Sequence, residues 1–135
     1  MIKIALCDDN RYLLGKLEEL LYELAERHKL HIDVDCFGDG AKLLEKIKKG
    51  ERFDIIYMDI QIGGMDGLET AYRIREFDWN FQLAYVTSYE SYMKEAFKSA
   101  PIAFIMKPIK VKEFEDTFLC CKNSRNIMRI IVFAI

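Results

Sequence analysis

The segment IKIALCDD, residues 2–9, joins a nearly continuous apolar run to two adjacent aspartates. An apolar run of this length is typical of a strand that is buried on both faces of a parallel sheet. The run stops at Asp8 and Asp9, whose charged side chains cannot share that buried environment. The segment therefore predicts a central strand whose carboxyl end carries two acids.

The same pattern continues along the chain, where short apolar runs alternate with amphipathic stretches. Further strands are expected at residues 31–37, 53–58, 82–86 and 102–106. Helices are expected over 12–27, from Asp39 to Lys49, from Asp66, from Ser88 and from Val111. Asp39 and Ser88 are predicted to act as N-caps. This alternation predicts an α/β fold with an open five-stranded parallel sheet and helices on both faces.

Polar side chains stand where the predicted strands end. They are Asp8, Asp9, Asp59, Thr87 and Lys107. The ligand site of an open parallel sheet lies outside the carboxyl ends of its strands, so these side chains are expected to meet there. Each alone could be an ordinary cap or turn residue. Five of them in order at strand ends indicate a site.

The residue types in this set point to phosphoryl transfer. Three carboxylates held close together repel one another unless a cation joins them, and oxygen ligands favour Mg²⁺. A carboxylate beside such an ion can act as a nucleophile, which predicts an acyl phosphate on Asp59. Lys107 would neutralise charge on the transferred group, and the Thr87 hydroxyl would bind one of its oxygens.

The order of these motifs resembles the receiver domains of two-component response regulators. The matching motifs are Asp8-Asp9, Asp59 followed by Met65-Asp66-Gly67, Thr87-Ser88 and Lys107-Pro108. The resemblance covers roughly residues 2–122 and implies a flavodoxin-like (βα)5 fold with strand order 2-1-3-4-5. Segments 4–10 and 86–90 are most similar to receivers of regulators with a LytTR-type DNA-binding domain.

The resemblance also implies how the site is loaded. Asp9 would bind Mg²⁺ directly, Asp8 through water, Gln61 through its backbone carbonyl, and Asp59 would complete the metal set. Asp59 would take its phosphoryl group from a phosphohistidine on a sensor histidine kinase and become 4-aspartylphosphate. The Lys107-Pro108 bond would be cis and would direct Lys107 toward the site.

A switch pair is implied as well, formed by Thr87 and Phe104. Thr87 would move toward the phosphoryl group, and the ring of Phe104 would turn inward. The surface of the fourth helix, fifth strand and fifth helix would change, and with it homodimerisation and transcriptional output through a LytTR-type domain absent from this chain. Gly63 stands where many receivers have proline. Tyr89 is expected to shield the acyl phosphate from water and prolong its life.

Two alternatives from other classes are open. The first is a Mg²⁺-dependent phosphatase of the haloacid-dehalogenase type, which also uses an aspartyl nucleophile. That class calls for a DxD motif after the first strand, where this chain has Asp8-Asp9, and the chain has no cap domain. The second is a receiver-like module that only binds partners, which the complete set of acids, hydroxyl and lysine disfavours.

Composition bounds the remaining possibilities. The 135 residues suit one compact domain, and 20 basic against 22 acidic residues give a net charge of -2, so nucleic-acid binding by this chain is not expected. Four cysteines without CxxC spacing suggest a reduced, cytoplasmic setting. The apolar stretches at both ends are too short to span a membrane.

The domain is expected to occupy residues 1–122. Residues 123–135, which end in the apolar run Ile127–Ile135, are expected to be a linker or the start of a missing output domain. The competing expectation is a tail that packs on a partner or pairs as an edge strand between two chains.

Overall fold

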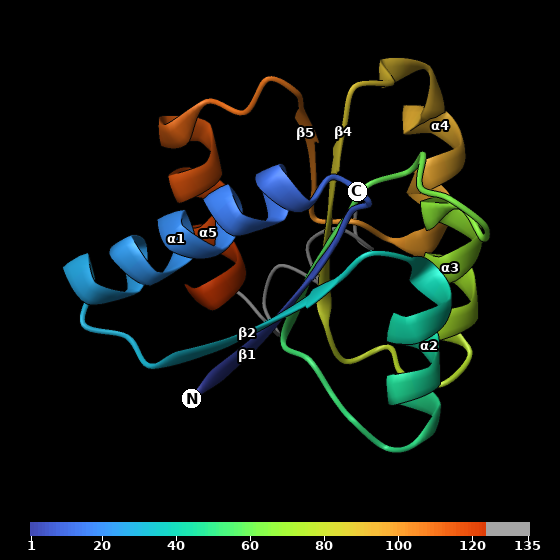
Figure 1. The fold of residues 1–135 in the computed structure, drawn as a ribbon, viewed down its shortest axis with the longest axis horizontal. Helices are drawn as coiled ribbons and strands as arrows, with labels where there is room; N and C mark the ends of the chain where they lie inside the picture. The colour runs from blue at the N-terminus through green and yellow to red at the C-terminus, as the bar shows by residue number, and fades with distance from the viewer. Residues whose placement is uncertain (124–135) are drawn as a thin grey trace.

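A computed structural model describes residues 1–123 and contains one parallel sheet of five strands. The strands are β1 (Ile2–Cys7), β2 (Ile32–Phe37), β3 (Ile55–Met58), β4 (Gln82–Thr87) and β5 (Ala103–Met106). Their order across the sheet is β2-β1-β3-β4-β5 (Figure 1). The predicted fold class and strand order are confirmed.

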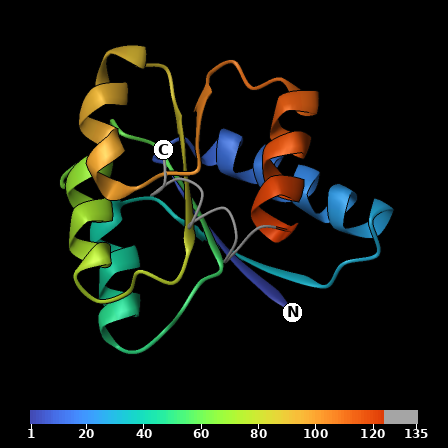
Figure 2. The ribbon, with the colours of Figure 1, turned by 180° about the vertical axis from the view of Figure 1, so that it is seen from behind.

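Helices cover both faces of the sheet. Within the described residues, the α-helices are α1 (Arg11–Arg27), α2 (Gly40–Lys48), α3 (Gly67–Arg75), α4 (Met93–Ala96) and α5 (Val111–Asn123). Helices α1 and α5 lie on one face and α2, α3 and α4 on the other, as both views show (Figures 1 and 2). No helix within residues 1–123 is long and apolar enough to cross a membrane.

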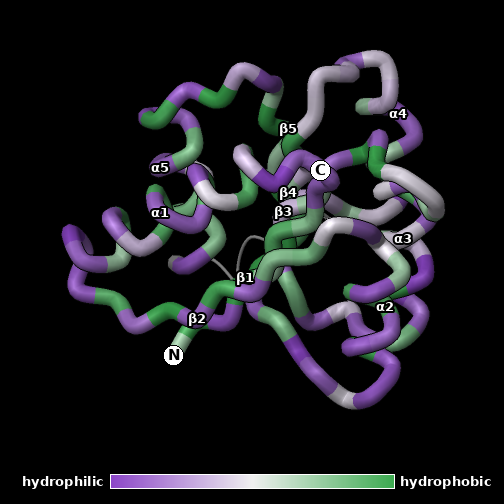
Figure 3. Tube along the Cα trace, viewed as in Figure 1, coloured by the Kyte–Doolittle hydropathy of each residue, from purple (hydrophilic) through white to green (hydrophobic). Residues whose placement is uncertain are grey.

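Strand side chains alternate between two buried clusters. Ile4 and Leu6 face the cluster formed with α1 and α5, whereas Ala5 and Cys7 face the cluster formed with α2 and α3. Because both faces of β1 are covered, its apolar run is continuous rather than alternating. Figure 3 shows the resulting hydrophobic centre inside helices of mixed polarity.

Three helices begin at side-chain caps. Asn10 accepts a hydrogen bond from Leu13 N at 3.1 Å. Asp39 caps α2 as predicted, accepting from the Lys42 amide at 2.8 Å. Asp66 likewise begins α3. These caps satisfy amides that have no partner within the helix.

The prediction that Ser88 caps a helix was wrong. A short 3₁₀ turn, η1 (Glu90–Tyr92), precedes α4, and its N-cap position is held by Tyr89 without a side-chain hydrogen bond. A second turn, η2 (Phe97–Ser99), follows α4 and ends at Ala100 in the left-handed conformation (φ 55°). Without a capping side chain, this segment forms short turns instead of one continuous helix.

Helix α5 ends at Asn123, one residue beyond the predicted boundary at 122, and the division of the chain at that boundary stays a prediction. Residues 124–135 lie outside the described part of the chain. The expectations for this tail stay predictions.

Two buried tyrosines offer a matched test of hydrogen bonding in the core. The hydroxyl of Tyr57 has no hydrogen-bond partner among the described residues, whereas the hydroxyl of Tyr85 lies 2.6 Å from Ser99 Oγ. We expect Tyr57→Phe to keep or raise the free energy of unfolding, by up to about 1 kcal/mol, because it removes an unsatisfied polar group. We expect Tyr85→Phe to lower it by about 1 kcal/mol.

Urea unfolding followed by far-UV circular dichroism would measure both changes. Equal losses in the two variants would contradict the assignment of Tyr57 as the unpaired hydroxyl.

Candidate functional site

Three aspartates meet at the carboxyl edge of the sheet. Asp8 and Asp9 follow β1, and Asp59 follows β3, the strand beside it. One carboxylate oxygen from each lies within 4.8 Å of the others. Asp8 and Asp59 are buried, whereas Asp9 is exposed to solvent. The cluster is therefore open on one side.

Lys107 lies against two of these acids. Its ammonium donates to Asp8 Oδ2 at 2.7 Å and to Asp59 Oδ2 at 3.0 Å. The residue follows β5, its amide donates to the Thr87 carbonyl at 2.9 Å, and its bond to Pro108 is cis. Burial lowers the pKa of Lys107, but the hydrogen bonds to Asp8 and Asp59 outweigh burial and the net pKa is raised. Lys107 therefore stays charged at neutral pH.

The donor set fits a hard divalent cation. Three carboxylates face one ammonium, which leaves an excess of negative charge. Lys107 occupies only one oxygen of Asp59, since Oδ1 is buried and has no hydrogen-bond partner among the described residues. Burial, followed by Asp39 and the site acids, raises the pKa of the Cys7 thiol to about 12, so it offers no thiolate. Asp8, Asp9 and Asp59 could hold Mg²⁺.

Thr87 and Phe104 lie on the neighbouring strands β4 and β5. Thr87 is fully buried at the end of β4, and its Oγ1 is 3.4 Å from the Tyr89 amide. Phe104 is partly buried and pairs in register with Tyr85, with ring centroids 5.9 Å apart. The two predicted switch residues therefore lie on adjacent strands, Thr87 at the site and Phe104 on the core side.

Gln61 lies two residues beyond Asp59, on the loop that leads to α3. Its side-chain amide donates to the Tyr92 hydroxyl at 3.1 Å, which connects this loop to η1. Nothing in the sequence pattern pointed to Tyr92, because the contact joins residues 31 positions apart. Such a pair becomes visible only when β3 and β4 lie side by side.

Two positioning residues also escaped the sequence analysis. The Asn10 amide donates to Asp8 Oδ1 at 2.9 Å and thereby orients that carboxylate. A Cβ atom at Gly67 would overlap the backbone carbonyl of Asp59, so only glycine lets α3 begin so close to the acid. The Asp8-x-Asn10 spacing could have indicated the first, since aspartate often accepts from the amide two residues on.

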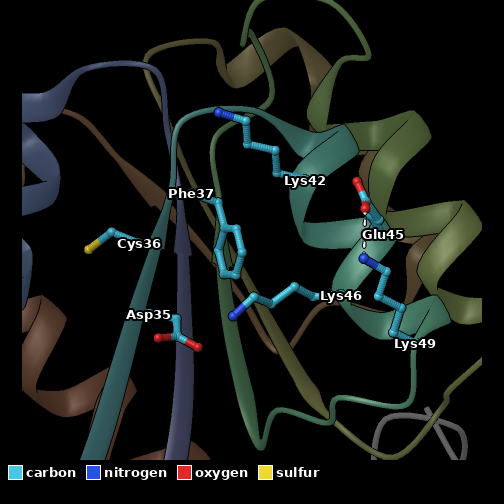
Figure 4. Close-up of a pocket in the computed structure, with 7 residues that line it drawn as sticks. All are labelled: Asp35, Cys36, Phe37, Lys42, Glu45, Lys46 and Lys49. Carbon is cyan, nitrogen blue, oxygen red and sulfur yellow. Dashed lines mark hydrogen bonds and ion pairs between the residues drawn. The ribbon is translucent and has the colours of Figure 1, made fainter.

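A cavity of about 380 Å³ elsewhere in the fold has a different character. It lies between β2 and α2 (Figure 4), and its lining residues are Asp35, Cys36, Phe37, Lys42, Glu45, Lys46 and Lys49. Lys49 is paired with Glu45 at 2.9 Å. The cavity is lined by mixed charges and contains none of Asp8, Asp9, Asp59, Thr87 and Lys107, so the acid cluster is the candidate site.

Comparison with known proteins gives concordant results. The response regulator receiver domain model matches residues 4–118. Hybrid signal transduction histidine kinase L of Dictyostelium discoideum is 31% identical, over 84% of this chain and 7% of that protein. Sensory transduction protein LytT of Bacillus anthracis is 26% identical, over 93% of this chain and 49% of LytT. The chain thus spans about half or less of the length of these relatives.

Solved structures agree at the level of the fold. The response regulatory domain of mrkE from Klebsiella pneumoniae is 20% identical with a TM-score of 0.81, and the match covers 91% of this chain and 97% of that one. Response regulator TrrA from Thermotoga maritima, solved in complex with Mg(2+)-BeF, is 24% identical with a TM-score of 0.77, over 90% and 99%.

The family match and the fold lead to one assignment. The family model covers most of the chain, and the observed strand order is the one that the resemblance implied. The predicted likeness to receivers, including those of LytT-type regulators, is confirmed. The chain belongs to the response regulator receiver domain family of two-component signalling.

Proposed function

We propose that Asp59 accepts a phosphoryl group from the phosphohistidine of a sensor histidine kinase. The observation that carries this proposal is the unpartnered Oδ1 of Asp59, which lies in the acid cluster while Oδ2 is held by Lys107. One oxygen is thus oriented and the other is free to attack. The solved complex of TrrA with Mg(2+)-BeF supports the metal requirement by similarity.

The transfer step follows from the groups present. Oδ1 of Asp59 attacks phosphorus, the bond from phosphorus to the histidine nitrogen breaks, and an acyl phosphate and a free imidazole result. Asp8, Asp9, Asp59 and the Gln61 backbone carbonyl would hold Mg²⁺, which would supply positive charge to offset that of the phosphoryl oxygens. Lys107 exchanges its bond to Asp59 for one to the transferred group.

The output is a change of surface. Thr87 binds a phosphoryl oxygen through its hydroxyl, and Phe104 on the adjacent strand moves with it, which alters the face of α4, β5 and α5. The protein acts in the cytoplasm as a switch and promotes its own phosphorylation and dephosphorylation. The proposal extends to homodimerisation on phosphorylation and to control of transcription through a LytTR-type output domain. Similarity to sensory transduction protein LytT favours that output, and homodimerisation is an expectation carried by the proposal alone. No observation favours the phosphatase alternative.

Replacing the nucleophile should abolish phosphorylation. After incubation with acetyl phosphate and Mg²⁺, intact-protein mass spectrometry should show one added phosphoryl group on the native chain and none on Asp59→Asn, because the amide is a poor nucleophile. Asp39→Asn is the matched control, since asparagine caps a helix as well as aspartate does. A phosphoryl group on Asp59→Asn would place the acceptor elsewhere.

Replacing Lys107 should weaken both folding and transfer. In the presence of EDTA, Lys107→Met should lower the free energy of unfolding by about 2 kcal/mol, because Asp8 and Asp59 lose their cation in a partly buried site. It should also slow phosphorylation by acetyl phosphate by at least about tenfold.

The difference in the free energy of unfolding between the native chain and Lys107→Met should depend on pH. The pKa of Lys107 is raised above its ordinary 10.5, so its contribution is fully present below about pH 10.5 and is lost as the pH rises through the folded-state pKa. Urea titrations between neutral and strongly alkaline pH would check this. A difference that stays constant across that range would contradict the ion-pair origin.

A further inference from the structure

We propose that Tyr92 is a positioning residue for the loop between β3 and α3, which would carry the metal ligands Asp59 and Gln61. Its hydrogen bond to Gln61 would couple cation binding to η1, the start of the α4 segment (η1, α4 and η2, residues 90–99). The inference rests on the proposed function, because it takes Mg²⁺ as the cation and the Gln61 carbonyl as one of its ligands. The geometry that carries it is the 3.1 Å contact between Gln61 Nε2 and the Tyr92 hydroxyl.

The loop after Asp59 is held firmly on one side only. Ile60 and Ile62 are buried, so Gln61 between them projects outward. The next two residues, Gly63 and Gly64, are exposed, and a Cβ atom at either would meet nothing within 4 Å. Gly64 also has a positive φ of 78°. The hydrogen bond to Tyr92 connects this glycine-containing stretch to η1, which follows the neighbouring strand β4.

Tyr92 is a suitable anchor because its ring is held by the core. The ring is partly buried against the cluster formed with α2 and α3. Tyr89 packs edge-on against it, with ring centroids 6.1 Å apart. Core packing and the ring of Tyr89 thus support the Tyr92 side chain, whose hydroxyl faces Gln61. A loop that is already held by such an anchor loses less conformational entropy when it binds a cation, so the cation should bind more tightly.

Although the Tyr92 ring is packed against the core, the backbone of η1 is weakly held. It has no side-chain cap, and its internal bond from the Tyr92 amide to the Tyr89 carbonyl is long, at 3.4 Å. The Tyr89 amide is also 3.4 Å from Thr87 Oγ1. Among the described contacts of η1, the one from Gln61 is shorter than either. A cation that restricts the motion of Gln61 should therefore also restrict the motion of η1, because this hydrogen bond connects the two.

Linkage makes the effect reciprocal. If Tyr92 helps Mg²⁺ to bind, bound Mg²⁺ must by the same factor stabilise the arrangement in which Tyr92 holds Gln61. This route to α4 is separate from the proposed movement of Thr87 and Phe104, because it starts at the loop after β3. It would act on metal binding alone, before any phosphoryl group arrives.

The test uses the complete 135-residue chain and MgCl₂ as the probe. Calorimetry should show Mg²⁺ binding to Tyr92→Phe weakened by about two- to tenfold, the range that one hydrogen bond of ordinary net strength provides. Hydrogen exchange read by mass spectrometry should show that Mg²⁺ slows exchange over residues 89–97 in the native chain and not in Tyr92→Phe. Tyr89→Phe is the matched control, since it removes a hydroxyl three residues away and keeps the ring.

A double-mutant comparison distinguishes loss of the hydrogen bond between Gln61 and Tyr92 from a general destabilisation of the protein. Tyr92→Phe should have no further effect on Mg²⁺ affinity once Gln61→Ala has removed the partner. The inference is overturned if Tyr92→Phe matches the native chain in Mg²⁺ affinity and in the slowing of hydrogen exchange. It is also overturned if Tyr89→Phe loses that slowing to the same degree, or if Mg²⁺ does not slow exchange in η1 of the native chain. Failure of the native chain to bind Mg²⁺ at all would overturn the proposed function as well, and calorimetry distinguishes that case.

Discussion

The ammonium of Lys107 lies between the carboxylates of Asp8 and Asp59 and joins the ends of β1, β3 and β5. Without it, two buried carboxylates would stand together with no nearby cation, which is strongly unfavourable. The pairing offsets part of the negative charge that the two acids bring to this edge of the sheet. Lys107 can exchange one anionic partner for another, so a phosphoryl group on Asp59 could take the place of an aspartate oxygen beside its ammonium.

The two ends of the α4 segment are held to different degrees. At the η2 end, the buried guanidinium of Arg75 donates to the carbonyls of Ser99 at 2.9 Å and Ala100 at 3.2 Å, and Ser99 also pairs with Tyr85. At the η1 end, a side-chain cap is missing and the local bonds are long. A segment fixed at one end and loose at the other can respond to small changes at the site.

The loose end is also the end nearest the chemistry. Thr87, at the end of β4, leads into Tyr89 and η1, and Gln61 reaches η1 from the loop after β3. The site therefore contacts the same turn from two adjacent strands. Packed elements change between discrete arrangements rather than by continuous deformation, so two contacts on one weakly held turn favour a switch.

The sequence by itself determined the sheet, the faces of the helices and the strand-end residues, because burial and hydrogen bonding impose short periods that can be counted along the chain. Asp39 as a cap and the order of the acids followed from such local rules. The sequence did not reveal the short turns around α4, where a capping side chain is missing, or the contacts of Gln61 with Tyr92 and of Gly67 with Asp59. Those features were decided by tertiary structure. The contacts join residues that are distant in the sequence, and the order of the strands in the sheet and the path of the loops bring these residues together.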